Sequence, residues 1–140
     1  MAIQYHPKRG TILVADFDQG FKRPEMVKKR LCVVVSPPIE HRVGLCTVVP
    51  LSKSEPHPKT DYHYEFEIQF QLPTFWGNDK RWAKCDMVCA VGFHRLDLLR
   101  LGKDRNGGRI YQLNTLSSIH MSHISNGILA SIGVAPLTTS

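Results

Sequence analysis

The sequence shows no long hydrophobic run, no signal-peptide pattern and no phosphate-binding loop. No apolar segment of the 140-residue chain approaches the ~20 residues that a membrane-spanning helix needs. The first six residues show no signal-peptide pattern. We therefore expect a cytoplasmic protein that has no membrane partner.

Metal-ligand patterns are scarce as well. Only Cys85 and Cys89 approach the spacing of a zinc pair, and a zinc site needs something like two such pairs. His120 and His123 do not complete the set, and the carboxylates do not cluster. We expect no metal and no cofactor. The cysteines lie in or beside predicted strands, and we interpret them as buried apolar side chains in a reducing compartment; they are Cys32, Cys46, Cys85 and Cys89.

The composition favours one folded, basic domain. A chain of this length can bury a useful core without disulfides, and its 42% hydrophobic content argues against disorder. We expect a single domain over residues 1–140. The net charge is +6 and the pI is about 9.3. This charge indicates an anionic partner, although a merely solvated basic surface has the same composition.

Basic and aromatic residues occur close together along the chain. The positive residues gather at Lys22-Arg23, Lys28-Lys29-Arg30, Lys80-Arg81, Lys84 and the segment 100–109. The aromatic residues near these clusters are Phe17, Phe21, Phe75, Trp76 and Trp82. Unpaired nucleic-acid bases stack on such rings beside cations. Core packing or a dimer contact explains the tryptophans about as well.

Short apolar runs and one alternating run predict a mainly β protein. We expect strands at residues 10–17, 31–36, 45–51, 62–70, 83–92 and 110–113, with loops at 18–30, 56–60 and 72–79. A short helix is predicted at 94–100. A final helix at 119–132 is capped by Ser117 or Ser118 and ends at Gly133. The expected fold class is α+β, a small, partly open barrel with a C-terminal helix.

Two Val-rich runs, 31–35 and 45–51, are flanked by the most informative polar residues. Arg30 stands directly before the first run, and Ser52 stands directly after the second. If the two strands pair side by side, the Arg30 guanidinium and the Ser52 hydroxyl lie on one rim of the sheet. These groups bind phosphate oxygens without a phosphate loop, so the pattern indicates a phosphate site.

Four segments together resemble the MazF/PemK (Kid) family of toxins from type II toxin–antitoxin systems. The resemblance extends over about residues 7–99, and its segments are Gly10–Asp16, Arg30–Ser36, Val48–Ser52 and Lys84–Asp86. Leu31 stands where the family usually has proline, and Lys84 stands where the Kid-like branch has arginine. The histidine of that branch has no match in residues 18–29.

The resemblance implies an SH3-like barrel, a homodimer and a metal-independent endoribonuclease that cleaves single-stranded RNA and is neutralised by a cognate antitoxin. Attack by the ribose 2′-hydroxyl requires a base, an acid and a cation. By resemblance, Arg30 stabilises the pentacoordinate phosphate and Ser52 hydrogen-bonds the scissile phosphate. Asp86 is the base or orients the hydroxyl, and Lys84 is the acid or a second cation. The expected RNA-binding residues are Lys22, Arg23, Lys28, Lys29, Lys53 and Arg81.

Each catalytic candidate also has a structural interpretation. Arg30 and Asp86 can form an ion pair, Ser52 can cap the turn that follows it, and Lys84 can be a solvated side chain. An unbroken alternating strand over residues 83–92 places residues 84 and 86 on one face, where their side chains can act together.

Three alternatives stay open. Arg23 forms an Arg-Pro pair with Pro24 and competes with Arg30 for the role of catalytic arginine. A protein of the same fold can also bind nucleic acid, or a protein target such as gyrase, without cutting. The third alternative is a structural or regulatory protein of a phage or plasmid. The histidines have no identifiable partner, so we assign surface or core roles to His57, His63, His94, His120 and His123.

Overall fold

The computed structural model describes residues 2–77 and 79–135 as eight strands, three 3₁₀ turns and one α-helix. The strands are β1 (Ile12–Asp16), β2 (Lys29–Val34), β3 (Leu45–Ser52), β4 (His63–Glu67), β5 (Lys80–Lys84), β6 (Cys89–Gly92), β7 (Leu96–Lys103) and β8 (Arg109–Gln112). The 3₁₀ turns are η1 (Thr74–Trp76), η2 (Cys85–Met87) and η3 (Phe93–Arg95), and the helix is α1 (Ser118–Ser131).

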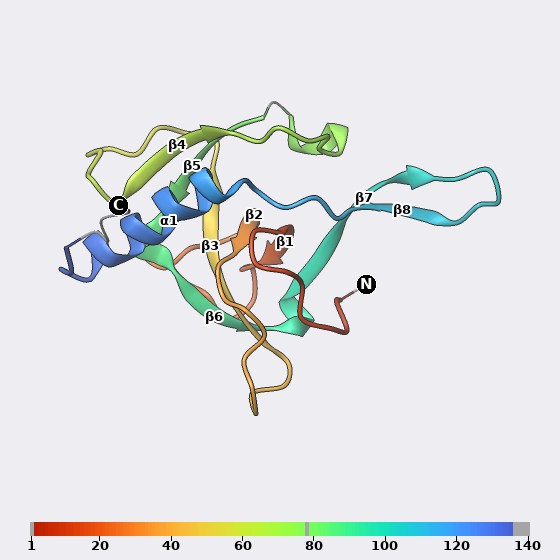
Figure 1. Ribbon diagram of the computed structural model, residues 1–140, viewed down its shortest axis with the longest axis horizontal. Helices are drawn as coiled ribbons and strands as arrows, with labels where there is room; N and C mark the ends of the chain where they lie inside the picture. Colours follow the sequence, from red (N-terminus) through yellow and green to blue (C-terminus); the bar gives the residue numbers. More distant parts are fainter. Residues whose placement is uncertain (1, 78, 136–140) are drawn as a thin grey trace.

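The strands pair antiparallel in one open sheet of order β4-β5-β3-β2-β1-β7-β8, and β6 pairs with β3. One edge of β3 has two partners, because residues 45–48 pair with β6 and residues 51–52 pair with β5. Its other edge pairs with β2. Figure 1 shows α1 near β4 and β5, while the β7–β8 hairpin projects away from the rest of the molecule. The predicted mainly β, open fold with a C-terminal helix is confirmed.

The central strand β2 is buried on both faces. Leu31 and Val33 belong to one core cluster, and Cys32 and Val34 belong to a second. Alternate residues of a strand face opposite sides, so a strand covered on both sides is apolar throughout. Arg30, at the start of this strand, is therefore held on a backbone that both clusters fix.

Helix α1 covers the first core cluster. Ser117 is its N-cap, and the Ser117 hydroxyl accepts a hydrogen bond from the His120 N–H at 3.3 Å, so Ser117 is the cap of the two that were predicted. Met121, Ile124 and Gly127 form the buried side of the helix. Across the residues that the structure describes, no helix is both long enough and apolar enough to cross a membrane.

The prediction of one unbroken strand over residues 83–92 is wrong. The 3₁₀ turn η2 separates β5 from β6, so both can pair in succession with the same edge of β3. The turn also carries the Cys85 side chain into the core, where it is fully buried. Because the chain is not extended here, alternation does not place residues 84 and 86 on one face.

The prediction of a helix over residues 94–100 is wrong as well. After the turn η3 the chain forms strand β7, which pairs with β1 on one side and β8 on the other. Leu96 and Leu99 are buried, and this spacing resembles a helix when it is read alone. The segment is extended because it pairs with β1, which is distant in the sequence, and with β8, which follows it. This pairing overrides the local helical spacing.

Candidate functional site

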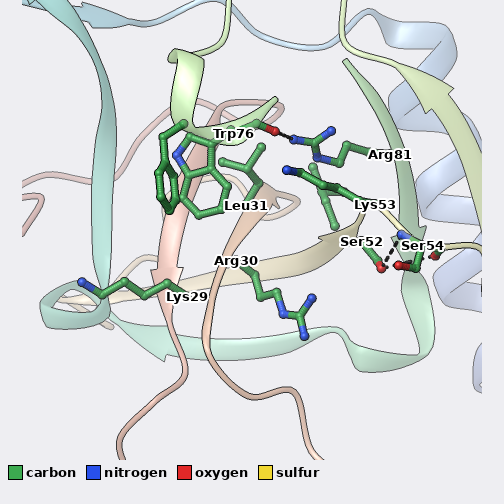
Figure 2. A pocket seen from close by; sticks show the side chains of 10 residues that line it. Lys29, Arg30, Leu31, Ser52, Lys53, Ser54, Trp76 and Arg81 are labelled. Atoms are coloured by element: carbon green, nitrogen blue, oxygen red, sulfur yellow. Dashed lines mark hydrogen bonds between the residues drawn. The ribbon is translucent and has the colours of Figure 1, made fainter. Parts of the chain in front are cut away.

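Arg30 and Ser52 line the same hollow, which has a volume of about 360 Å³ (Figure 2). Arg30 is half-buried at the start of β2, and its Nε donates to the Val27 carbonyl at 3.1 Å. Ser52 ends β3 and is 7% exposed. Its hydroxyl accepts a hydrogen bond from the Ser54 N–H at 3.2 Å and donates one to the Ser54 carbonyl at 3.3 Å. Ser52 therefore caps the turn after β3 while it borders the hollow.

The wall of this hollow is basic and aromatic. Lys29, Lys53 and Arg81 join Arg30 there, and no carboxylate is among the lining residues. The remaining polar and apolar lining residues are Leu31, Leu51, Ser52, Ser54, Phe75 and Trp76. Such a wall attracts an anion with an attached ring.

Arg81 is built into the wall. It is 1% exposed, and its guanidinium donates to the Trp76 carbonyl at 2.5 Å and to the Lys80 carbonyl at 2.7 Å. Burial lowers the pKa of Arg81, and the nearby Asp79 carboxylate opposes this shift. The side chain thus ties the loop between β4 and β5 to strand β5.

Arg30 also lines a second hollow, which has a volume of about 590 Å³. It holds two more predicted site residues, Arg23 and Lys84, together with Glu25. Its other walls are Pro24, Met26, Val27 and Met87. Arg30 is therefore the boundary between an aromatic, basic hollow and one that combines cations with a carboxylate.

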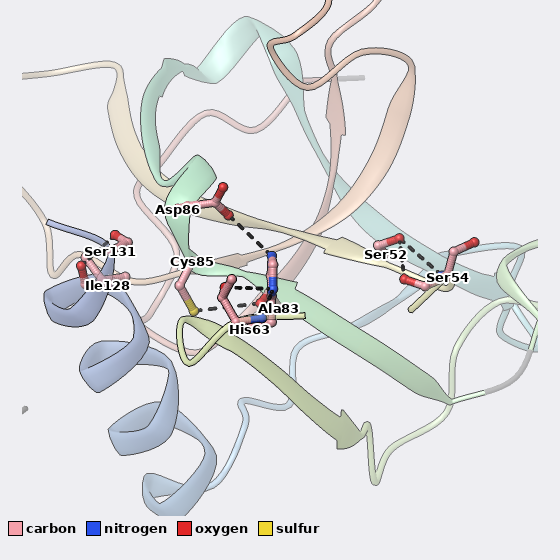
Figure 3. Close-up of polar contacts among 9 residues, drawn as sticks. Ser52, Ser54, His63, Ala83, Cys85, Asp86, Ile128 and Ser131 are labelled. Carbon is pink, nitrogen blue, oxygen red and sulfur yellow. Dashed lines mark hydrogen bonds and ion pairs between the residues drawn. The ribbon is translucent and has the colours of Figure 1, made fainter. Parts of the chain in front are cut away.

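Asp86 borders a third hollow that shares Pro24, Glu25, Met26 and Met87 with the second. Among the described residues Asp86 has no ion pair with Arg30. Its Oδ1 lies 3.8 Å from Nε2 of His63 (Figure 3). The structural interpretation of an Arg30–Asp86 pair is therefore not observed.

His63 is the residue that the sequence analysis missed. Its side chain is 7% exposed, and its Nδ1 accepts from the Thr60 N–H at 3.1 Å. A neutral ring that accepts at Nδ1 carries its proton at Nε2, which faces Asp86. Residues 63 and 86 meet only because β4 pairs with β5, in a register that sets His63 opposite Lys84. No local sequence pattern signals such a contact.

The predicted RNA-binding residues fall into three groups. Lys29, Lys53 and Arg81 line the first hollow, and Arg23 lines the second. Lys22 and Lys28 are exposed in the loop before β2 and line neither hollow.

The structure also locates the cysteines. Cys32, Cys46 and Cys85 are buried free thiols, and Cys89 is half-buried. Burial raises the pKa of Cys46 to about 11 and the pKa of Cys85 to about 12. Within residues 2–77 and 79–135, no group of three or more His, Cys, Asp or Glu side chains is arranged to hold a metal ion.

The described residues form an open antiparallel sheet, with arginine and serine beside a cation-lined hollow. The chain belongs to the PemK-like, MazF-like toxins of type II toxin–antitoxin systems, since the family's sequence profile matches residues 8–132.

Two relatives in sequence are similar over most of their length. An uncharacterised protein of Haemophilus influenzae is 35% identical over 104 residues, which cover 66% of this chain and 71% of that protein. YifN of Escherichia coli strain K12 is 33% identical over 118 residues, which cover 71% of this chain and 78% of that protein.

Solved structures share the fold at low sequence identity. An endoribonuclease in complex with its cognate antitoxin, from a mycobacterial species, has a TM-score of 0.58 at 14% identity and covers 91% of this chain and 95% of its own. MazF of Deinococcus radiodurans also has a TM-score of 0.58, at 16% identity, and covers 93% of this chain and 99% of its own.

Proposed function

We propose that this protein is a metal-independent endoribonuclease that cleaves single-stranded RNA and is held in check by a cognate antitoxin. The observation that carries the proposal is the position of Arg30. It borders both the hollow that contains Ser52 and the hollow that contains Lys84. We place the scissile phosphodiester over Arg30, because this side chain lines both hollows.

The proposed reaction needs no cofactor. The ribose 2′-oxygen bonds to phosphorus while the bond from phosphorus to the 5′-oxygen breaks, which leaves a 2′,3′-cyclic phosphate and a free 5′-hydroxyl. Asp86 takes the proton of the 2′-hydroxyl, and Lys84 gives a proton to the departing oxygen. Arg30 and the Ser52 hydroxyl stabilise the charge that develops on the phosphoryl oxygens.

The first test is cleavage in the absence of divalent ions. Purified protein should cut a long single-stranded RNA in EDTA and leave cyclic or 3′-phosphate ends. A requirement for Mg²⁺, or ends with a 3′-hydroxyl, would contradict this mechanism. Intact RNA after long incubation would instead favour a non-cutting protein of the same fold.

Substitutions then rank the residues. Arg30→Ala should lower the cleavage rate by ~10²–10³, as expected for one transition-state donor, and Lys84→Ala should lower it less. Both side chains reach solvent, so circular dichroism spectra should stay unchanged. If Arg30→Ala cleaves normally and Arg23→Ala does not, the catalytic arginine is Arg23.

We further propose that the protein works as a homodimer in the cytoplasm, where messenger RNA is translated. An acidic, disordered antitoxin segment would cover the loops at residues 18–29 and 56–60 beside Arg30 and Ser52. Antitoxin and RNA should then compete, and the complex should weaken as salt rises. A ternary complex with undiminished RNA affinity would rule out this arrangement.

A further inference from the structure

The loop between β4 and β5 places two aromatic rings at the edge of the Arg30 hollow. Phe75 and Trp76 lie on the turn η1, and their rings meet edge to face with centroids 5.1 Å apart. Phe75 is 84% exposed, whereas Trp76 is half-buried against the first core cluster. Trp76 therefore supports Phe75 from below and leaves most of the Phe75 ring open to a ligand.

The rings are held on a fixed backbone. The Trp76 N–H donates to the Pro73 carbonyl at 3.0 Å, and the Gly77 N–H donates to the Thr74 carbonyl at 3.1 Å. Arg81 binds the Trp76 carbonyl from beneath. A loop backbone that is already ordered loses little conformational entropy when a ligand binds beside it.

Cations lie beside the rings. Figure 2 shows the Lys53 ammonium group directed towards Trp76, and Arg30 also lines the hollow. The lack of a side chain at Gly77 leaves space for the Lys53 ammonium group, since a Cβ at position 77 would lie 3.1 Å from the Lys53 Nζ. Gly77 also has a φ of +73°, a conformation that glycine adopts without strain.

We propose that this hollow is a nucleotide subsite, in which one unpaired base stacks on Phe75 while Lys53 binds the adjacent phosphate. The inference rests on the proposed function, because it takes RNA as the ligand. The volume of the hollow, about 360 Å³, lies within the range of small-ligand pockets. The scissile phosphate lies over Arg30, so the base on Phe75 belongs to a nucleotide flanking the cut. A loop of this chain therefore holds the nucleotide next to the cut.

The test uses an RNA that binds without being cut. A labelled single-stranded oligonucleotide with 2′-O-methyl ribose is titrated with protein and followed by fluorescence anisotropy. Base–aromatic stacking of ~1–3 kcal/mol corresponds to a 5- to 150-fold change in Kd. Phe75→Leu should weaken binding by that factor, whereas Phe75→Tyr should stay within about threefold of wild type. Val43→Ala removes another exposed apolar side chain and should leave Kd unchanged.

Salt dependence separates stacking from charge. Lys53→Ala should make the slope of log Kd against log salt shallower by ~0.7, the value for one phosphate of a single strand. Phe75→Leu should weaken binding equally at all salt concentrations. Lys103→Ala, on the projecting β7–β8 hairpin, is the matched charge control and should change neither quantity. A Lys53→Ala slope equal to the wild-type slope would overturn the phosphate contact.

Two further outcomes decide the base contact. A duplex of the same sequence should compete poorly, because its bases are already stacked; equal competition would reduce the hollow to a phosphate site and overturn the inference. Wild-type affinity of Phe75→Leu overturns it too, even if the protein cleaves RNA. Phe75-dependent binding without any cleavage of unmodified RNA supports the subsite and defeats the proposed nuclease instead.

Discussion

Replacing Gly127 with alanine tests how closely α1 packs on the turn that carries Asp86. A Cβ at position 127 would lie 2.7 Å from the Cys85 Sγ, 3.1 Å from the Cys85 Cβ and 3.2 Å from the Tyr62 carbonyl oxygen. All three distances are shorter than ordinary van der Waals contacts. Cys85 is fully buried, so its thiol has no open space into which it can rotate.

Two effects of opposite sign determine how much Gly127→Ala changes the free energy of unfolding. Alanine in a helix interior is favoured over glycine by ~1 kcal/mol. Overpacking a dense core costs ~1–3 kcal/mol. With three close contacts we take about 2 kcal/mol for overpacking, so Gly127→Ala should lower the free energy of unfolding by about 1 kcal/mol. The η2 turn should also shift, and RNA cleavage should fall further than the loss of folded protein explains.

Urea denaturation followed by circular dichroism measures the change. Ser122→Ala, at an exposed position of the same helix, has no such clash and should stabilise the protein by ~0.5 kcal/mol. In a Cys85→Ala background the cost of Gly127→Ala should shrink, because the closest atom is gone. A Gly127→Ala protein that is more stable than wild type would refute the close packing of α1 against η2.

Two other predictions concern His63 and the buried thiols. His63→Gln keeps a donor towards Asp86, whereas His63→Asn keeps only the acceptor for the Thr60 N–H; cleavage should therefore fall about tenfold in the Asn variant and much less in the Gln variant. The reverse order would show that His63 acts only by holding the loop. Burial raises the pKa of Cys85 to about 12 and that of Cys46 to about 11, above the value near 9 of an exposed thiol. The folded protein keeps these protons to a higher pH than the unfolded chain does. The thiols therefore make their whole contribution to the free energy of unfolding below pH 9, and this contribution is lost as the pH rises towards 11–12. Cys85→Ala should flatten this fall in urea titrations; an unchanged pH profile would contradict it.

The sequence predicts the parts of the fold that depend on local pattern. Continuous apolar runs identified β2 and β3, and a serine before an apolar helical stripe identified the start of α1. Arg30 and Ser52 were placed correctly on one rim, because both adjoin strands that pair directly.

The features that depend on distant contacts were missed. The η2 turn exists because β3 bonds to β5 and β6 in succession, and β7 is extended because β1 and β8 flank it. The contact between His63 and Asp86 is set by the register of β4 against β5. Local residue spacing carries no information on such long-range pairing.

The loop between β4 and β5 is fastened through its main chain. Arg81 donates to the Trp76 carbonyl, and the buried Gln112 of β8 donates to the Gln71 carbonyl at 2.8 Å. A carbonyl is present whatever the side chain is, so these attachments survive substitution at Phe75. The side chain at position 75 can therefore change during evolution without loosening the loop. New ligand preferences can arise at this position while the fold stays the same.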